Sequence, residues 1–311
     1  FFSNINVGES KMNNDNYPFN NQPSHHFPQS SFPNPIPEDD DDTPQLLSEP
    51  RRVNAGMGSR WIAHAWEIFK ARWIMWLGMA FVMVLITGVL GEIPYIGWTS
   101  NFLNLFFLGG LMLSCDALVE GDELEFGYLF SGFKYKFVDL LVCNVIMFVM
   151  VVALVLVVLL SMGMGMGSTS LFATSLEDMS NSDMAQLLIL GLLFFVLLLP
   201  VIMMVWFAPA LICLHDIKPW QAMKMSLQAC LRNIVPFIVY SLVMLLVMMG
   251  LSTLVGGIIT GMIFLVSGNE MVGMMVAGVL IIPFALLTTI FLSITYYTSY
   301  RSIWTTPTLE D

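Results

Sequence analysis

Six long hydrophobic stretches dominate the chain from residue 73 onward. Each supplies the roughly 20 residues with which a helix crosses a bilayer. Backbone polar groups cannot stay unpaired in hydrocarbon, so the stretches are predicted to be helices rather than strands. The pattern predicts an all-α membrane protein with six transmembrane helices arranged as three hairpins, and Pro200 and Pro209 are expected to kink the fourth span. The spans are expected near residues 73–91, 95–115, 139–160, 185–214, 235–263 and 272–299.

An amphipathic segment with basic residues precedes each hairpin. In residues 219–233 a polar and an apolar stripe recur at helical spacing, and residues 61–72 and 126–136 repeat the arrangement. Such helices lie in the plane of the lipid headgroups. We expect them to brace the hairpins, and the alternative is a ring that docks lipid headgroups or a partner. The candidate interfacial or partner-docking residues are Trp61, Lys70, Arg72, Lys134, Lys136, Trp220, Lys224 and Arg232.

The basic residues indicate how the chain is oriented. Under the six-helix prediction all 12 Lys and Arg residues fall on the same side as both termini. The loops of the opposite side, near 91–94, 161–184 and 264–271, contain none. Because loops rich in Lys and Arg stay in the cytoplasm, both termini are predicted to be cytoplasmic. The four cysteines lie near the same ends of the spans, where a reducing compartment predicts free thiols.

Composition excludes two classes of protein. Hydrophobic residues make up 57% of the chain and charged residues 11%, whereas a soluble domain carries about 45–50% and about 25%. The net charge of −11 and the lack of a basic stretch argue against a nucleic-acid partner. Residues 1–55, acidic and rich in Asn and Pro, are predicted to be a disordered cytoplasmic tail. Residues 56–304 form the predicted membrane domain, and 305–311 a short cytoplasmic C-terminus.

Small residues and methionines are further candidates. Small residues four apart allow helices to approach closely, within the chain or between copies; the candidates are Ser252, Gly256, Gly257 and Gly261. Three methionines alternate with glycine, and thioethers suit Cu(I); these copper candidates are Met162, Met164 and Met166. No His or Cys accompanies them, so copper handling is only an alternative, and no metal or cofactor is expected.

Catalytic motifs are absent from the sequence. It contains no P-loop, GxSxG, HExxH or dinucleotide fingerprint. No charged residue falls near a predicted bilayer midplane, where it would suggest transport or a proton relay. His215 and Asp216 are expected only to end the fourth span, and the alternative is that the two adjacent side chains form a protonatable pair. The chain is therefore not expected to be an enzyme.

Five short segments carry a resemblance to a known family. They are Phe207-Ala-Pro-Ala-Leu, Pro219-Trp-Gln-Ala-Met-Lys-Met-Ser226, Arg232-Asn233, Pro236-Phe237 and Tyr297-Thr-Ser-Tyr300-Arg301. Together they resemble an uncharacterised bacterial inner-membrane family, which is similar to the membrane domain of some glycerophosphodiester phosphodiesterases. The resemblance covers about residues 56–304. It implies a six-helix bundle in a bacterial inner membrane and supplies no catalytic residues.

These observations lead to a hypothesis about function. We expect a non-catalytic accessory, scaffold or lipid-interacting subunit of a membrane assembly. Its partners would be membrane lipids and either another protein or a second copy of the chain. The alternative is a small-solute or copper(I) transporter, which requires a polar or Met-lined path between the hairpins.

Overall fold

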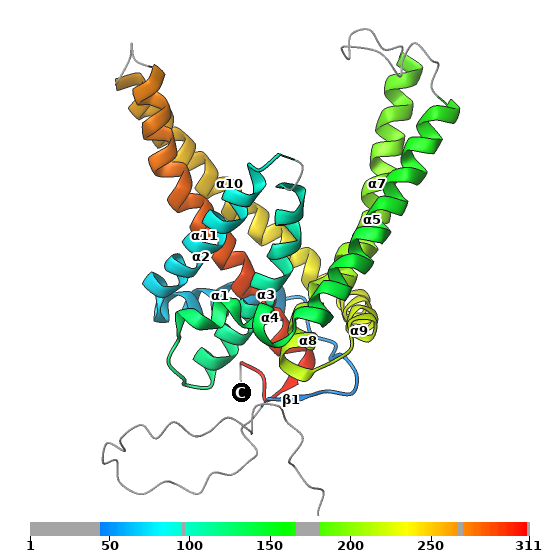
Figure 1. Ribbon diagram of the computed structural model, residues 1–311, viewed down its shortest axis with the longest axis vertical. Helices are drawn as coiled ribbons and strands as arrows, with labels where there is room; N and C mark the ends of the chain where they lie inside the picture. Colours follow the sequence, from blue (N-terminus) through cyan, green and yellow to red (C-terminus); the bar gives the residue numbers. More distant parts are fainter. Residues whose placement is uncertain (1–43, 95–96, 166–180, 266–269, 310–311) are drawn as a thin grey trace, which may run out of the picture. The chain divides into compact units, whose positions relative to one another are not determined.

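Three helical hairpins form the membrane part of the chain (Figure 1). The computed structural model describes residues 44–94, 97–165, 181–265 and 270–309. Six helical segments there are long and apolar enough to cross a membrane, so the protein is an all-α membrane protein, as the hydrophobic pattern predicts. The hairpin helices are α2 (Trp73–Gly91) and α3 (Ser100–Val119), α5 (Phe137–Gly165) and α7 (Asn181–Trp206) with α8 (Ala208–His215), and α10 (Ile234–Leu265) and α11 (Glu270–Trp304).

Shorter elements connect the hairpins. The amphipathic segments become α1 (Met57–Ala71), the 3-10 helix η3 (Phe126–Phe130) with α4 (Ser131–Tyr135), and α9 (Pro219–Arg232). A second 3-10 helix, η2 (Gly97–Thr99), lies in the first hairpin turn. The strands β1 (Gln45–Leu46) and β2 (Thr305–Thr306) pair antiparallel, with Gln45 opposite Thr306. This pairing joins the two ends of the described chain.

Each amphipathic element packs mainly on a hairpin other than the one it leads into. The segment η3–α4 packs against α3 of the first hairpin, and α9 packs against α7 and α8 of the second. The first element, α1, packs against α10 and α11 of the third hairpin. The three units therefore interlock in a closed cycle of contacts, so no hairpin depends only on its own connecting helix.

Helix α1 lies directly on the backbone of α10. Its buried positions, which include Met57, Trp61, Ala65 and Ile68, recur at helical spacing and form one face. A Cβ on Gly58 would lie 2.3 Å from the carbonyl oxygen of Pro236. Only glycine permits this approach, which brings the two helix backbones into contact.

Glycines also seat the second unit. A Cβ on Gly132 would lie 2.2 Å from the carbonyl oxygen of Phe106 in α3, and one on Gly110 would lie 2.2 Å from that of Leu129 in η3. Gly132 weakens the amphipathic pattern of 126–136. The absence of a side chain at both glycines is what allows η3 and α4 to approach α3.

The fourth predicted span consists of two helices. Pro200 lies inside α7, whereas the helix is interrupted at Phe207 and Pro209 lies in the first turn of α8. Proline has no N–H group and its ring clashes with the carbonyl four residues earlier, which explains an interruption next to Pro209. The chain therefore changes from α7 to α8 before it reaches the end of the span.

Two predicted boundaries need correction. The first span matches α2, but the second begins at Ser100 rather than near residue 95, because residues 97–99 form η2 within the hairpin turn. The predicted tail, 1–55, extends too far. Residues 45–53 belong to the fold through β1 and through hydrogen bonds to the end of α11. Residues 1–43 lie outside the described residues.

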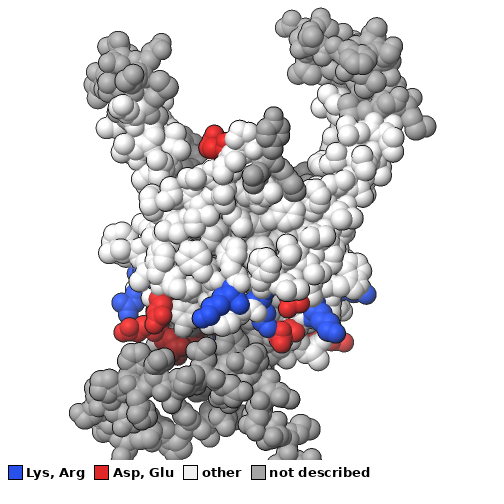
Figure 2. Space-filling model, viewed as in Figure 1, with Lys and Arg blue, Asp and Glu red and all other residues white. Residues whose placement is uncertain are grey.

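The described Lys and Arg residues gather at one end of the bundle, which we call the basic end. It comprises the α1–α2 turn, α4, the α8–α9 connection, α9 and the last turn of α11. Figure 2 shows these side chains in a single band, beside a span surface that is free of charged groups over most of the visible face. Away from this end, Asn144 of α5 donates a hydrogen bond to the Phe102 carbonyl in the first turn of α3 at 3.0 Å.

Replacing Gly58 by alanine is expected to destabilise the protein by about 1–3 kcal/mol, because overpacking forces α1 away from α10. Thermal unfolding of the purified protein in mild detergent, followed by tryptophan fluorescence, measures the effect. The matched control is Gly88→Ala, since a Cβ at Gly88 meets nothing within 4 Å. Equal unfolding midpoints for the two variants would contradict the close contact.

Candidate functional site

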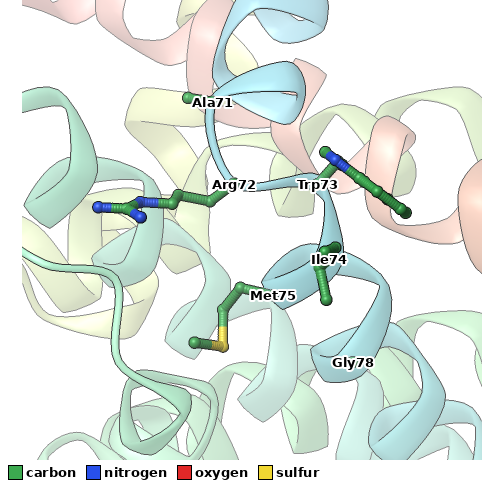
Figure 3. A pocket seen from close by; sticks show the side chains of 6 residues that line it. All are labelled: Ala71, Arg72, Trp73, Ile74, Met75 and Gly78. Carbon is green, nitrogen blue, oxygen red and sulfur yellow. The ribbon is translucent and has the colours of Figure 1, made fainter.

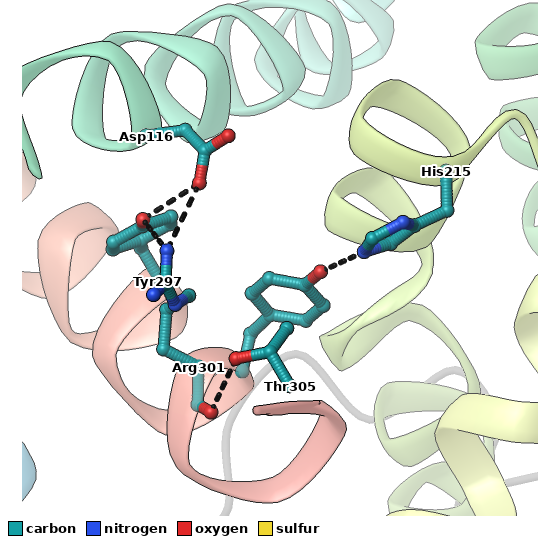
Figure 4. Close-up of polar contacts among 6 residues, drawn as sticks. Asp116, His215, Tyr297, Arg301 and Thr305 are labelled. Atoms are coloured by element: carbon teal, nitrogen blue, oxygen red, sulfur yellow. Dashed lines mark hydrogen bonds and ion pairs between the residues drawn. The ribbon is translucent and has the colours of Figure 1, made fainter. Parts of the chain in front are cut away.

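A buried ion pair connects the first and third hairpins at the basic end (Figure 4). The Tyr297 hydroxyl of α11 donates a hydrogen bond to the Asp116 carboxylate of α3 at 2.7 Å. One turn later, Nη1 of Arg301 lies 3.5 Å from the same carboxylate oxygen and 3.1 Å from the tyrosine hydroxyl. The Arg301 side chain is 5% exposed and that of Asp116 is 21% exposed. Burying a charge is unfavourable without a partner, so the two side chains keep α3 and α11 in register.

The neighbouring residue of α11 reaches the second hairpin. A ring nitrogen of His215, at the end of α8, is hydrogen-bonded to the Tyr300 hydroxyl (Figure 4). The Thr305 hydroxyl donates to the carbonyl of Arg301 at 2.8 Å and holds the end of α11. The last turns of α11 thus contact both other hairpins.

His215 and Asp216 lie at the end of the fourth span, as expected. Asp216 ends α8 in the left-handed conformation, with φ of 55°, and its carboxylate pairs with Lys136. The alternative, a pair between His215 and Asp216, is not present among the described contacts. Lys136 is buried and engaged with Asp216, so its predicted docking role is wrong.

Ser226 binds the backbone groups that the interruption between α7 and α8 leaves unpaired. In a continuous helix the N–H of Phe207 would bond the carbonyl of Met203. The Ser226 hydroxyl of α9 instead accepts the Phe207 N–H at 2.9 Å and donates to the Met203 carbonyl at 2.6 Å. The hydroxyl thus satisfies two buried backbone groups, whose burial would be unfavourable without a hydrogen-bond partner.

Asn233 is hydrogen-bonded to the N-terminal segment at the basic end. Its side-chain oxygen accepts the N–H of Val53 at 2.9 Å, and its amide nitrogen donates to the carbonyl of Arg51 at 2.9 Å. The N–H of Leu47 donates to the carbonyl of Trp304 at 2.8 Å. Residues 45–53, which we call the strap, therefore cross from the end of α11 to the start of α10.

Burial controls the titration of groups at the basic end outside the spans. It raises the pKa of the Cys230 thiol to about 12, which keeps the thiol neutral at physiological pH. Burial and the nearby Asp116 charge raise the pKa of Glu120. All four cysteines are free, as the sequence predicts, and the structure shows that all four are buried. In the described part of the chain, no group of three or more His, Cys, Asp or Glu side chains is placed to hold a metal ion.

The predicted interfacial residues separate into buried and exposed groups. Trp61 is fully buried, with its ring 5.1 Å from that of Phe237, so the prediction that it docks a partner is wrong; α1 turns this face toward α10. The remaining residues lie on the surface of the basic end: Lys70, Arg72, Lys134, Trp220, Lys224 and Arg232.

Three of these exposed cations already have a neighbour. Lys134 lies 4.9 Å from the ring centre of Tyr135, and Lys224 lies 5.1 Å from that of Trp220. Arg232 pairs with Glu49 of the strap at 3.0 Å. The basic end therefore carries an exposed set of cations and aromatic side chains, an arrangement typical of a membrane–water interface.

The small-residue stripe of α10 does not pack against the other described parts of the chain. Ser252, Gly256, Gly257 and Gly261 are exposed, and a Cβ on any of the three glycines would meet nothing within 4 Å. A different face of α10 packs against α11. On that face the Tyr240 hydroxyl is hydrogen-bonded to the Thr295 hydroxyl of α11 at 2.8 Å, and Met244 is buried. The prediction of packing within the chain is wrong, and packing between copies stays a prediction.

The copper candidates are not tested by the described structure. Met162 and Met164 lie in the last turn of α5, where the side chains are outside the described structure, and Met166 lies outside the described residues.

Several residues that connect the hairpins at the basic end could not be identified from sequence. Asp116 and Arg301 are 185 positions apart, and no local pattern connects them. The one available signal was the set of short segments on which the family resemblance rests. They contain residues whose hydrogen bonds connect elements at the basic end: Phe207, Ser226, Asn233, Tyr300 and Arg301.

Arg301→Gln is expected to destabilise the protein by about 3–5 kcal/mol, because the Asp116 carboxylate stays in place without its cation. Thermal unfolding in detergent measures the loss, and adding Asp116→Asn should restore part of it. The control is Arg232→Gln, which removes an exposed pair with Glu49 and should change stability by less than about 1 kcal/mol. Equal losses in the two single variants would show that the buried pair is not important for stability.

Comparison with known proteins places the chain among uncharacterised membrane proteins. A Burkholderia thailandensis protein named as a probable inner membrane protein is 24% identical over 256 residues, which cover 80% of this chain and 91% of the relative. No solved structure gives a significant match. Together with the six apolar helices, the relative supports a bacterial multi-pass inner-membrane protein. Residues 75–303 match the family described as "Domain of unknown function (DUF7847)", and the chain belongs to that family.

Proposed function

We propose that this inner-membrane protein is a non-catalytic accessory, scaffold or lipid-interacting subunit of a membrane assembly. The observation that carries the proposal is the uneven burial of its spans. In the described structure, 56% of the most apolar part of α3 is buried inside the chain, compared with 11% for α5 and 17% for α10. The second and third hairpins therefore offer long helix faces to lipid and to the helices of other membrane proteins.

The polar groups of the described spans support the same proposal. Asp116, Tyr297 and Arg301 contact one another, and His215 contacts Tyr300. Each of these side chains holds two helices together at the basic end. Their geometry fits a structural role, and the segments that carry the family resemblance have the same role.

The positions of the basic residues support an orientation for this subunit. Lys and Arg side chains are retained on the cytoplasmic side during insertion. The basic end, which carries the strap and the end of α11, is accordingly proposed to face the cytoplasm. The likeness to the membrane domain of glycerophosphodiester phosphodiesterases also stays a proposal, since neither the family description nor the name of the relative refers to those enzymes.

Cysteine labelling tests the orientation. Glu92 follows α2 at the end opposite to the basic end, and Glu123 lies between α3 and η3 at the basic end; both are exposed. A membrane-impermeant maleimide should label Glu92→Cys in spheroplasts with an intact inner membrane and Glu123→Cys only after lysis. The four native cysteines are buried, which keeps the background low. The reverse labelling pattern would place the basic end outside the cytoplasm.

Cross-linking tests the assembly. Ser252 is exposed on α10, whereas Ser293 is buried on α11. In membranes treated with a bifunctional maleimide, Ser252→Cys should give a discrete cross-linked species, identified by mass spectrometry as one partner protein or a second copy. Ser293→Cys should give none, because its neighbours belong to the same chain.

Two results would overturn the proposed function. The first is a monomer without cross-links at Ser252 and at further exposed positions on α5 and α7. The second is copper-dependent uptake by the purified protein in vesicles that Met164→Leu with Met166→Leu abolishes, which would favour the transporter alternative.

A further inference from the structure

The turn between α1 and α2 forms a surface pocket with one cationic side chain. The pocket has a volume of about 400 Å³ and is lined by Ala71, Arg72, Trp73, Ile74, Met75 and Gly78. Figure 3 shows Arg72 and Met75 extending to one side of the turn and Trp73 to the other. Apart from the guanidinium of Arg72, all the side chains that line it are apolar or nearly so.

Arg72 differs from three other exposed cations of the basic end. Lys134 and Lys224 lie over aromatic rings, and Arg232 pairs with a glutamate. Among the described residues, no carboxylate forms an ion pair with Arg72. Its charge is therefore available to an anion from outside the chain.

The depth of the pocket identifies the kind of anion. Arg72 directly precedes the first residue of the α2 span, so its side chain lies at the level of the lipid headgroups. Below it, Trp73 is 53% exposed and Ile74 is 68% exposed, and both require an apolar cover. A soluble anion would neutralise the arginine but leave this surface in contact with water. A phospholipid supplies a phosphate and an acyl chain in that order along the bilayer normal.

Gly78 keeps the lower part of the pocket open. It lies about one turn below Met75 on α2, and a Cβ at this position would lie 3.4 Å from Cε2 of Phe126 in η3. A larger side chain would fill the space between α2 and η3. Gly88, further along the same helix, has nothing within 4 Å of its Cβ position and offers a matched comparison.

We propose that the α1–α2 pocket binds an anionic phospholipid, with its phosphate on Arg72 and an acyl chain along Ile74, Met75 and Gly78. This inference rests on the proposed lipid-interacting character of the subunit and makes it specific. It assigns to one pocket a lipid contact that general attraction to the basic end would spread over all exposed cations.

Native mass spectrometry of the full chain in mild detergent tests the proposal. Phosphatidylglycerol and phosphatidylcholine are added at equal concentrations. The wild-type protein should retain phosphatidylglycerol in preference, and Arg72→Gln should reduce its binding about fivefold, the effect of one basic residue at a membrane surface. Lys224→Gln, with the same loss of charge on α9, should bind as the wild type does. Gly78→Leu should reduce binding while Gly88→Leu does not, and tryptophan fluorescence melts confirm that each variant is folded.

The opposing results are equally specific. Equal losses in Arg72→Gln and Lys224→Gln would show general electrostatic attraction, and equal binding of both lipids by every variant would exclude an anionic site. Displacement of phosphatidylglycerol by inorganic phosphate at millimolar concentration would indicate a site for soluble anions. Each of these overturns the pocket while leaving the Ser252 cross-linking result unaffected, so failure of this inference is distinguishable from failure of the assembly role.

Discussion

Helices in a bilayer gain little from the hydrophobic effect when they associate, because lipid tails are as apolar as leucine side chains. Association therefore depends on close backbone packing and on polar contacts between helices. This protein concentrates both at the basic end. Gly58, Gly110 and Gly132 allow backbones to touch, and Asp116 with Arg301 places a paired charge between two hairpins. The described parts of the hairpins beyond this region pack against little of the chain.

The cycle of contacts follows from this constraint. A short amphipathic helix buries more apolar surface by packing on a neighbouring hairpin than by lying alone in the headgroup region. α1 does so on the third hairpin, η3–α4 on the first and α9 on the second. Each hairpin is contacted by the amphipathic segment that leads into another hairpin. The three hairpins are therefore connected at the basic end, although the buried fraction of their spans differs. The strap adds a further connection through Asn233.

The family resemblance acquires a physical meaning from these contacts. Ser226 closes the interruption that accompanies Pro209, Asn233 binds the strap, and Arg301 pairs with Asp116. In this chain, these residues join the hairpins and the strap at one end. Contacts of this kind stabilise a fold and supply no chemistry, so the resemblance indicates a fold and no activity. The surfaces that distinguish this chain are the outer helix faces and the pocket at Arg72.

Features that depend on local composition could be predicted from the amino-acid sequence alone. Long apolar stretches predicted the spans, since a bilayer requires a fixed length of apolar helix, and α2 lies where the pattern placed it. The gathering of Lys and Arg at one end could also be predicted, because each basic residue falls outside the spans that the hydrophobic pattern predicts. The partner of each side chain, in contrast, depends on how the helices pack. Trp61 was predicted to be an interfacial residue and is part of the core. Lys136 was predicted to be a docking cation and pairs with Asp216. Helix α9 buries small residues such as Ala222 and Ser226, while Trp220 stays exposed. Hydropathy describes how a residue interacts with its solvent, whereas these outcomes depend on neighbours supplied by distant parts of the chain.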